Sequence, residues 1–376
     1  MRVALVLYGG LDLISGGFLY DRLLVEYLRR QGEEVEIVSL SWRSYAGGLL
    51  DNLSPSLRRR LASLRADVIL QDELAHPTLF RLNRSLERQG GPPVVAIVHH
   101  LRCSETRPAW QNHFYRLVEQ RYLASVNAFI FNSRATQKTV EDLVGQGRPS
   151  VLAYPGANRF AVALTRKDLA ARSKEPGPLR LLFLGNVIPR KGLHTLLSAL
   201  ALLPREVWQL NVVGSLEVDL PYVRQIRRQI ATAGLGGRVN FTGVLGQEAL
   251  ASCLAKSQVL AVPSSYEGFG IVYLEGMAFG LPALATMAGG AVEIITSGRD
   301  GFLVPPGDYG SLAGHLGTLM HDRDLLLAMG LAAQARFASH PTWEDAGAAV
   351  HRFLIDHVLS SAKGYYEFFL GGGPGT

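Results

Sequence analysis

The sequence predicts an α/β protein made of two doubly wound, Rossmann-like domains in tandem. The chain of 376 residues is longer than one ordinary hydrophobic core accommodates. Short apolar runs alternate with helical patterns along its length, which is typical of parallel sheets covered by helices. The polar segment 165–178 interrupts this alternation and ends in two prolines, so we expect it to link the two domains.

The first half alternates strands and helices from its first residues. Each strand is predicted from a short apolar run, and the runs cover residues 2–8, 34–40, 67–71, 93–99, 128–131 and 151–154. Each helix is predicted from apolar residues at helical spacing, and these patterns cover residues 17–31, 54–65, 77–89, 107–126 and 134–144.

The second half repeats the alternation after the polar segment. Its strands are predicted at residues 179–184, 207–213, 238–241, 258–262 and 282–285. Its helices are predicted at residues 190–203, 219–233, 246–255, 270–279 and 308–321, and helical patterns continue to about residue 369. Since doubly wound sheets bind ligands at the carboxyl ends of their strands, we expect the two domains to face each other across a cleft.

Composition is that of a globular protein. Hydrophobic residues make up 48% of the chain and charged residues 19%, unlike a disordered protein. No apolar run reaches the ~18 residues of a spanning helix, and a strand begins at residue 2, so we expect neither a membrane span nor a signal peptide. The two cysteines, Cys103 and Cys253, are expected to be free thiols of a cytoplasmic protein.

The basic charge lies in the first half. The net charge is +6, and residues 1–160 hold 20 Lys and Arg against 15 Asp and Glu. Such an excess suits an acidic substrate, an anionic membrane surface or a nucleic acid. No nucleic-acid-binding motif accompanies it, so we expect no nucleic-acid partner.

A glycine turn between two carboxylates is the strongest local signal. Glu267 and Glu275 bracket a turn that contains Gly268 and Gly270, after the buried run 259–263 and before a helix. The backbone N–H groups at such a helix start attract an anion, and the glycines let a ligand come close. Carboxylates on both sides suit the hydroxyls that flank a diphosphate, as in a sugar nucleotide. The alternative is a helix whose acidic residue simply faces solvent.

Cations and small residues follow the neighbouring strands. Arg190 and Lys191 come after the turn Gly185-Asn186 and before a helix, where they favour phosphate, although a solvated pair is the alternative. Small residues also end the next two strands, where a nucleotide base could lie: Gly214, Thr242 and Gly243.

The first half has two candidate site features of its own, and each follows the end of a predicted strand. Gly16 and Gly17 open a helix after the first strand, which makes a second phosphate-facing helix start, with a mobile surface loop as the alternative. His99 and His100 leave the fourth strand, and we expect one of them to face the cleft. We expect no metal site there, because no Asp or His near them in the sequence completes a ligand set.

These residues together resemble glycosyltransferase family 4, retaining enzymes of the GT-B fold. The resemblance covers nearly the whole chain and is most specific between residues 183 and 308. Its motifs are the two glutamates with seven residues between them, Glu267 and Glu275, the Arg-Lys-Gly at 190–192, and the segments 289–293 and 300–308. In the first half, Gly16, Gly17, His99, Asn132 and Ser133 match the donor-facing loops.

The resemblance implies a role for each site residue. Arg190 and Lys191 would neutralise the diphosphate of the donor as it leaves. Glu267 would bind the sugar hydroxyls, Glu275 the ribose, and His99 would lie beside the donor sugar. The remaining donor-binding positions are Gly16, Gly17, Gly185, Asn186, Gly214, Thr242, Gly243, Gly268, Phe269, Gly270, Ile271 and Val272, with His100 and Ser133 as further candidates. Asn186 stands where many members carry arginine.

The resemblance also implies the reaction and the domain limits. The activity would be hexosyl transfer with an α-linkage, from a UDP-, GDP- or ADP-linked sugar to an acceptor hydroxyl on a lipid, glycan or small molecule. It would need no cofactor, metal or protein nucleophile. The acceptor domain would span 1–165 plus a C-terminal helix at about 355–370, and the donor domain 178–354. The alternatives are a GT-B nucleotide-sugar epimerase and a non-catalytic nucleotide-sugar-binding protein.

A basic helix suggests a membrane surface. In the segment 53–65, four leucines share a helical face beside four arginines, Arg58, Arg59, Arg60 and Arg65. Such a helix could lie on the inner face of an anionic membrane, with Trp42 and Tyr45 in a neighbouring loop. The alternative is an ordinary surface helix that packs its leucines on the sheet.

Overall fold

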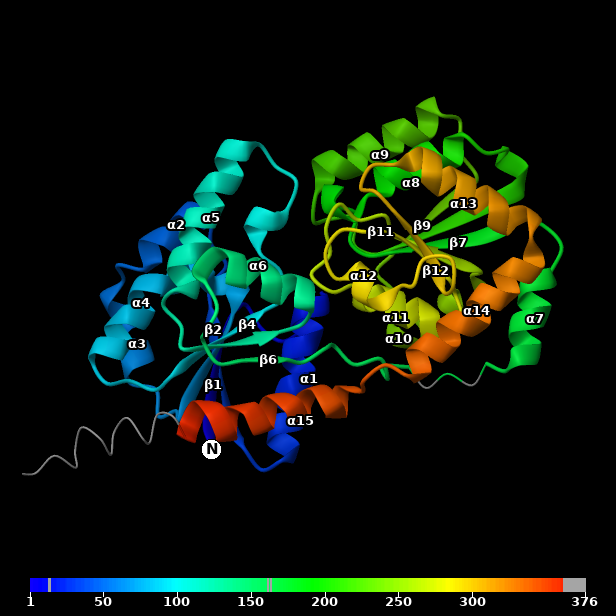
Figure 1. The fold of residues 1–376 in the computed structure, drawn as a ribbon. Helices are drawn as coiled ribbons and strands as arrows, with labels where there is room; N and C mark the ends of the chain where they lie inside the picture. Colours follow the sequence, from blue (N-terminus) through cyan, green and yellow to red (C-terminus); the bar gives the residue numbers. More distant parts are fainter. Residues whose placement is uncertain (13–14, 161, 163, 361–376) are drawn as a thin grey trace, which may run out of the picture. The chain divides into compact units, whose positions relative to one another are not determined.

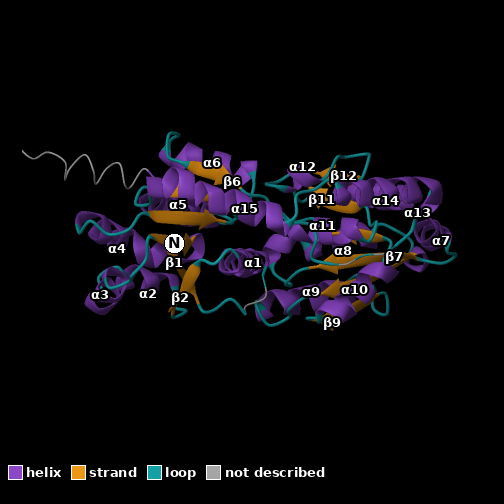
Figure 2. Cartoon of the chain, turned by 90° about the horizontal axis from the view of Figure 1, so that it is seen from below, coloured by secondary structure: helices purple, strands orange, loops and turns teal. Residues whose placement is uncertain are grey.

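The computed structural model describes residues 1–12, 15–160, 162 and 164–360, which form two compact units (Figure 1). The first unit takes residues 1–156 together with the chain from residue 341, and the second takes residues 157–340. Each unit contains one six-stranded sheet in which every neighbouring pair is parallel. In each unit the strands lie between layers of helices (Figure 2).

The first unit has the strand order β2-β1-β3-β4-β5-β6. Its strands are β1 (Arg2–Tyr8), β2 (Glu34–Leu40), β3 (Val68–Asp72), β4 (Val94–Val98), β5 (Ala128–Phe131) and β6 (Ser150–Leu152). Its helices are α1 (Gly16–Arg30), α2 (Tyr45–Asp51), α3 (Pro55–Ala62), α4 (His76–Arg88), α5 (Ala109–Leu123), α6 (Arg134–Val144) and α15 (Trp343–Phe353). Two short 3-10 helices, η1 (Glu73–Ala75) and η2 (Arg102–Ser104), and a π-helix that follows α15, η5 (Leu354–Leu359), complete the unit.

The second unit has the strand order β12-β11-β10-β7-β8-β9, the order of dinucleotide-binding folds. Its strands are β7 (Leu179–Leu184), β8 (Trp208–Val213), β9 (Val239–Gly243), β10 (Val259–Ala261), β11 (Ala283–Thr286) and β12 (Gly301–Val304). Its helices are α7 (Arg166–Lys174), α8 (Leu193–Ala201), α9 (Leu220–Thr232), α10 (Gln247–Lys256), α11 (Ile271–Ala278), α12 (Ala291–Ile294), α13 (Tyr309–His321) and α14 (Arg323–Ala338), with short turns η3 (Pro189–Lys191) and η4 (Arg205–Val207).

The predicted doubly wound α/β architecture is confirmed, and the central strands explain why it forms. All residues of β3, β4 and β5 are buried, as are those of β10 and β11. Continuous apolar runs of this kind suit strands covered by helices on both faces. The sequence did not indicate β12, which pairs with β11.

The predicted linker is wrong, because most of it is helix α7. Thr165 caps the helix and forms a capping box with Asp168. The helix buries Leu169 and donates from Arg172 to the carbonyls of Phe279 and Gly280 at the end of α11. The contacts attach this segment to the second unit, so the division falls at residues 156 and 157 instead.

The C-terminal helix α15 belongs to the first unit and packs on α1. A Cβ added at Gly347 would lie 2.3 Å from the Tyr27 ring, and His351 Nε2 lies 2.6 Å from Glu33 Oε1. The chain therefore joins this unit from residue 341, earlier than the expected 355. Residues 361–370 of the expected helix, and the tail 371–376, lie outside the described residues.

The leucine face of α3 is not available to a membrane. Leu61 is buried, and Leu57 and Leu64 pack against the core of the first unit. Only Leu53 of the four leucines is exposed, at 63%. The alternative of an ordinary surface helix is therefore correct for the apolar face. Among the described residues, no helix combines the length and hydrophobicity that crossing a bilayer requires.

Candidate active site

The second unit gathers its site residues where the direction of chain winding reverses. Strands β7 and β10 are neighbours in the sheet, but the chain leaves them toward opposite edges. Such a switch point opens a crevice at the carboxyl ends of the two strands. Arg190 and Lys191 lie in the connection after β7, and Glu267 lies in the connection after β10.

Glu267 is a buried carboxylate held by two cations and a hydroxyl. Its Oε1 lies 2.5 Å from Lys191 Nζ and accepts from Ser264 Oγ at 2.6 Å, and its Oε2 lies 3.4 Å from Arg190 Nη1. Burial alone would raise the pKa of Glu267, but the charges of Lys191 and Arg190 outweigh it and lower the pKa to about 2. Glu267 is therefore a permanent hydrogen-bond acceptor and not a proton donor.

The two cations are themselves held in place. Burial lowers the pKa of Lys191, and the neighbouring Glu267 charge opposes this shift. Arg190 donates from Nη1 to the carbonyl of Tyr266 at 3.0 Å. Two cations beside one carboxylate leave a net positive charge at the switch point, which suits an anionic ligand.

The turn that carries Glu267 is braced by the chain before α12. Gly290 donates its backbone N–H to the Glu267 carbonyl at 2.8 Å, and Gly289 pairs with Glu267 as a parallel bridge. Gly289 has φ +75°, and a Cβ there would lie 1.9 Å from the Glu267 carbonyl oxygen. The Gly-Gly of the 289–293 motif therefore permits a close backbone approach.

Helix α11 presents its N-terminus to the same crevice. It begins at Ile271 after Gly270, and no side chain caps this end. Phe269 is buried, whereas Ile271 and Val272 are half-buried. An uncapped helix start next to two cations is a favourable place for a phosphate.

The predicted small residues at successive strand ends do lie together. The N–H of Gly214 donates to the carbonyl of Gly243 at 2.9 Å, and the N–H of Gly185 donates to that of Val213 at 2.8 Å. Thr242 bonds the carbonyl of Val212 through its hydroxyl at 3.3 Å. The side chain of Asn186 accepts from the N–H of Ser215, so it braces this edge.

Glu275 lies within α11 and pairs with Arg159, which the sequence analysis missed. The Glu275 side chain is 6% exposed, and one of its oxygens accepts from the Arg159 guanidinium. Burial raises the pKa of Glu275, and the Arg159 charge opposes this. No local pattern marks Arg159, because it precedes Glu275 by 116 positions and follows no predicted strand directly.

Replacing Arg159 with glutamine should weaken nucleotide binding about tenfold, or ~1.4 kcal/mol. The buried carboxyl of Glu275 would lose its countercharge and become a poorer acceptor for ribose hydroxyls. Isothermal titration with UDP and GDP measures this, with Arg166→Gln on the exposed start of α7 as the matched control. Tighter binding in Arg159→Gln would instead mean that the guanidinium competes with the ribose.

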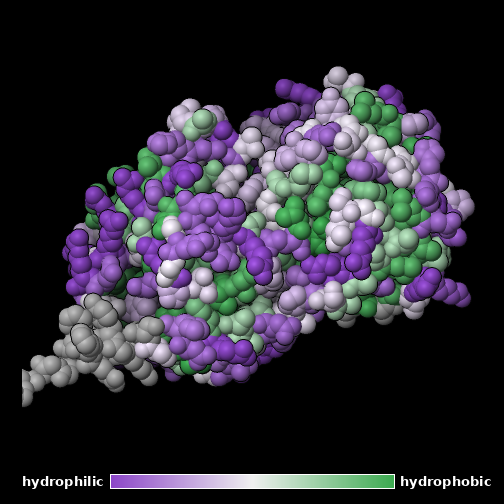
Figure 3. Space-filling model, viewed as in Figure 1, coloured by the Kyte–Doolittle hydropathy of each residue, from purple (hydrophilic) through white to green (hydrophobic). Residues whose placement is uncertain are grey.

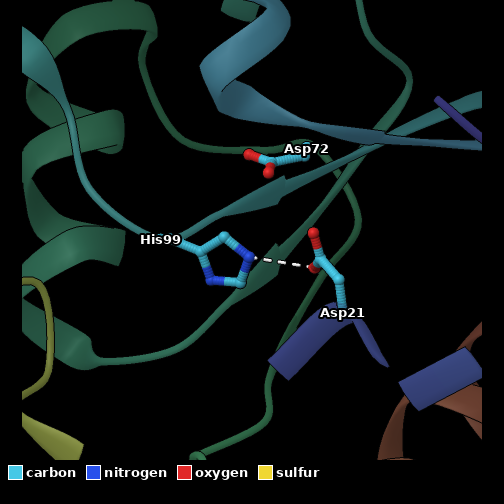
Figure 4. Close-up of side chains that lie close together, drawn as sticks. All are labelled: Asp21, Asp72 and His99. Carbon is cyan, nitrogen blue, oxygen red and sulfur yellow. Dashed lines mark hydrogen bonds and ion pairs between the residues drawn. The ribbon is translucent and has the colours of Figure 1, made fainter. Parts of the chain in front are cut away.

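In the first unit, His99 lies in a buried cluster with two aspartates (Figure 4). His99 Nε2 lies 3.0 Å from Asp21 Oδ1, and both aspartates are fully buried. The sequence showed no Asp or His nearby that could complete a ligand set with this histidine, but the fold brings Asp21 from α1 and Asp72 from the end of β3 beside it. One potential metal-ligand atom from each of the three residues lies within 4.8 Å of the other two. In the described part of the chain this is the one group of three His, Cys, Asp or Glu residues with that spacing. In the structure, the hydrogen bond to Asp21 engages His99 Nε2.

Of the other candidate residues in the first unit, Gly16 and Gly17 lie beside His99, whereas His100 and Ser133 make local contacts of their own. Gly17 packs on the His99 ring, since a Cβ there would lie 3.1 Å from its Cδ2. Gly16 begins α1 beside it. His100 instead places Nε2 2.8 Å from Glu105 Oε1. Ser133 caps α6 by accepting from the N–H of Thr136 at 3.0 Å, so its position indicates a structural role.

Two family models match the chain, one over most of the second unit and one over most of the first. A family model described as glycosyl transferases group 1 matches residues 165–336, and one described as glycosyltransferase family 4 matches residues 44–159. Together the two matches cover most of the chain and identify it as a family 4-like glycosyltransferase. The first match contains the whole switch-point cluster of the second unit, and the second contains His99 and Asp72.

Curated relatives of this glycosyltransferase share part of its length. It is 33% identical over 227 residues to a D-inositol 3-phosphate glycosyltransferase of Streptomyces scabiei, covering 57% of this chain and 51% of the relative. It is 31% identical over 204 residues to a GDP-mannose-dependent α-(1-6)-phosphatidylinositol monomannoside mannosyltransferase of Mycobacterium tuberculosis, covering 50% of this chain and 52% of the relative. The matched region thus spans about half the length of these relatives.

Solved structures show the same fold. A sucrose-phosphate synthase of Thermosynechococcus elongatus aligns with a TM-score of 0.77 and 23% identity over 99% of this chain and all of that chain. HepE of Anabaena, solved in complex with UDP-glucose, aligns with a TM-score of 0.75 and 21% identity over 94% of this chain and 99% of that chain. These likenesses confirm the GT-B class.

Proposed function

We propose that this protein is a retaining hexosyltransferase that moves a sugar from a nucleoside diphosphate to an acceptor hydroxyl with an α-linkage. The observation that carries the proposal is the buried Glu267, held by Lys191 and Arg190 beside the uncapped start of α11. A carboxylate that cannot protonate at neutral pH suits sugar hydroxyls. Two cations and a helix start suit the diphosphate.

The site residues suggest how the reaction would proceed. The bond between the sugar C1 and the diphosphate oxygen breaks as Arg190, Lys191 and the helix start stabilise the charge on the departing phosphate. The acceptor oxygen bonds to C1 on the same face, and its proton passes to the departing phosphate oxygen. This route uses no protein nucleophile, in keeping with the ion-paired state of Glu267.

The relatives narrow the donor that we propose. HepE is solved with UDP-glucose, and the Mycobacterium relative is named as GDP-mannose-dependent. We therefore propose a UDP- or GDP-linked hexose, with an ADP-linked one as the remaining option. Since two relatives are named for inositol-containing acceptors, we propose an acceptor with a free hydroxyl on a polyol, glycan or lipid head group.

Thermal-shift screening of UDP, GDP and ADP, followed by transfer assays with the matching sugars, tests the proposal. Binding to the native state raises the melting temperature by mass action, and turnover should transfer the sugar with its anomeric configuration retained. Binding without turnover across a panel of polyol, glycan and lipid acceptors would favour a non-catalytic binding protein. Conversion of the donor into an epimer would favour the epimerase.

We further propose that the first unit contacts an anionic membrane surface through α5. Trp110, Phe114 and Leu117 recur at helical spacing on this helix and are 72%, 44% and 38% exposed. The exposed charges of the helix are cationic, Arg116 and Arg121, because its one acidic residue is buried. The face drawn in Figure 3 exposes both hydrophilic and hydrophobic side chains. Apolar anchors with basic neighbours are typical of interfacial helices.

Replacing Trp110 and Phe114 with serine should reduce co-sedimentation with anionic liposomes at least tenfold. The loss follows from the apolar area that the two side chains would bury in the bilayer. The matched control is Leu202→Ser, since Leu202 is 61% exposed on the second unit. Reversal of Arg58, Arg59 and Arg60 to glutamate tests the basic face of α3 separately. Equal binding to neutral and anionic liposomes, or none, would contradict the membrane proposal.

A further inference from the structure

Three buried carboxyl groups surround the one imidazole of His99. Asp21 and Asp72 are 0% exposed and Glu73 is 2% exposed. Glu73 Oε2 accepts from the backbone N–H of His99 at 2.9 Å and of His100 at 3.3 Å, so this carboxyl holds the chain and not the ring. Of the residues that the structure describes, Asp21 alone bonds the ring, through Nε2.

The second oxygens of both aspartates have no hydrogen-bond partner among the described residues. These atoms are Asp21 Oδ2 and Asp72 Oδ2, and both are buried. Asp72 Oδ1 is satisfied by the N–H of Leu74 at 2.9 Å. Two ionised carboxylates this close repel each other, whereas one proton between them makes a hydrogen bond. A shared proton is therefore the simplest way to satisfy both oxygens.

No lysine or arginine within the described residues forms an ion pair with these aspartates. His99 is then the only side chain in contact that can supply a positive charge, and a buried carboxylate without a countercharge costs several kcal/mol. Burial lowers the pKa of His99, but the Asp21 charge and hydrogen bond outweigh it and raise the pKa to about 9. Burial and the neighbouring Asp21 raise the pKa of Asp72 to about 7.

We propose that Asp21 and Asp72 share one proton and hold His99 as an imidazolium, so that its Nδ1–H is a positively charged hydrogen-bond donor for a ligand oxygen. Figure 4 shows the second ring nitrogen of His99 turned away from both carboxylates. Gly17 packs on one side of the His99 ring, and Tyr20 contacts the ring in an edge-to-face arrangement with the two ring centres 5.2 Å apart. Asp21 and Asp72 are thus positioning residues. That this ligand takes part in sugar transfer rests on the proposed function, whereas the charge on His99 does not.

The groups that face His99 come from four elements. Helix α1 supplies Asp21 and Tyr20, β3 supplies Asp72, η1 supplies Glu73, and the amide of Asn132 after β5 donates to the His99 carbonyl at 2.9 Å. The Tyr20 hydroxyl donates to a backbone carbonyl, and burial raises its pKa, so it stays neutral. Ionisation of the carboxyl groups therefore controls the charge on His99.

Nitrogen-15 NMR of the histidines in the full chain, titrated from pH 5 to 10, tests this charge, with His99→Gln to assign the resonance. We expect His99 to titrate above pH 8. In Asp21→Asn its midpoint should fall by at least two pH units, because the carboxylate that stabilises the imidazolium is lost. In Asp72→Asn it should fall by less than one unit, because the amide mimics a protonated carboxyl.

Several outcomes would overturn the proposal. They are a wild-type midpoint near 6.5, equal shifts in the two variants, or broadening of the His99 signal by Mn²⁺ that Asp72→Asn abolishes, which would mean a cation site. Circular dichroism checks that the variants fold, and the pH profile of a transfer assay reports the protonation of His99 independently of NMR. Asp21→Asn should lower the upper pH limit of kcat/KM, and Asp72→Asn should leave it nearly unchanged. If His99 titrates above pH 8 but the protein transfers no sugar, the proposed function is contradicted and the proposal about the charge on His99 still holds.

Discussion

Replacing Lys191 with methionine should lower kcat for sugar transfer about 10²- to 10³-fold, or ~2.7–4 kcal/mol. Lys191 Nζ is the cation that lies nearest Glu267, at 2.5 Å, and the proposed reaction places it where charge develops on the departing diphosphate. Methionine keeps most of the volume and removes the charge. Steady-state kinetics with the donor identified by thermal shift measure the effect, and the exposed Lys167→Met on α7 is the control.

The loss of Lys191 also removes a partner of a buried carboxylate, so stability must be separated from activity. Lys191→Met should lower the melting temperature, because Glu267 keeps only the longer contact to Arg190 at 3.4 Å. Adding Glu267→Gln should restore much of the melting temperature, since the amide needs no countercharge. The double variant should remain inactive. Activity in the double variant close to the wild type would mean that neither side chain contributes to transfer.

The same ion pair predicts how stability depends on pH. The pKa of Glu267 is lowered from its ordinary 4.5 to about 2, so the folded state favours the ionised carboxyl. This contribution is present above about pH 4.5 and is lost as the pH falls toward 2. In Lys191→Met the loss over this window should be smaller, as urea denaturation at several pH values would show.

Replacing Gly192 with alanine should destabilise the second unit by about 2 kcal/mol or more and lower its melting temperature by roughly 4–8 °C. Gly192 has φ +73°, and a Cβ there would lie 2.0 Å from the carbonyl oxygen of Pro263. Because the obstacle is backbone at the end of β10, it cannot move without displacing the turn that carries Glu267. Donor affinity should therefore fall together with stability.

The matched control for this variant is Gly314→Ala. Gly314 lies within α13, and a Cβ there would meet nothing within 4 Å. Alanine should be neutral or slightly stabilising at this position, since it favours helix more than glycine. Differential scanning calorimetry of both variants tests the comparison. An unchanged melting temperature in Gly192→Ala would mean that the β10 turn relaxes freely.

Short motifs at strand ends made much of the candidate site in the second unit predictable. Arg190, Lys191, Glu267 and the α11 start lie in two connections, and each connection carries its own signal of cation or glycine beside a buried strand. A parallel sheet brings such connections to one edge. The segment 165–178 shows a local signal that was overlooked, because Thr165 and Asp168 have the spacing of a capping box and Leu169 follows them.

Long-range partners could not be predicted from the sequence. Arg159 reaches Glu275 across 116 positions, and Asp21 reaches His99 across 78. The leucines of α3 show the same limit, since an amphipathic pattern cannot tell whether its apolar face meets the core or a membrane. The structure answers that question by placing Leu57, Leu61 and Leu64 on the core.

By itself the sequence determined the two doubly wound domains, the family, and the glycine turn that brings carboxylates and cations to one place. These depend on local periodicity and on residues close together in one connection. The tertiary structure alone decided the charge environment of Glu275 and His99, the attachment of α7 and α15, and which leucines are buried. Each depends on side chains that meet only when distant segments pack, and burial then sets the charge that each group carries.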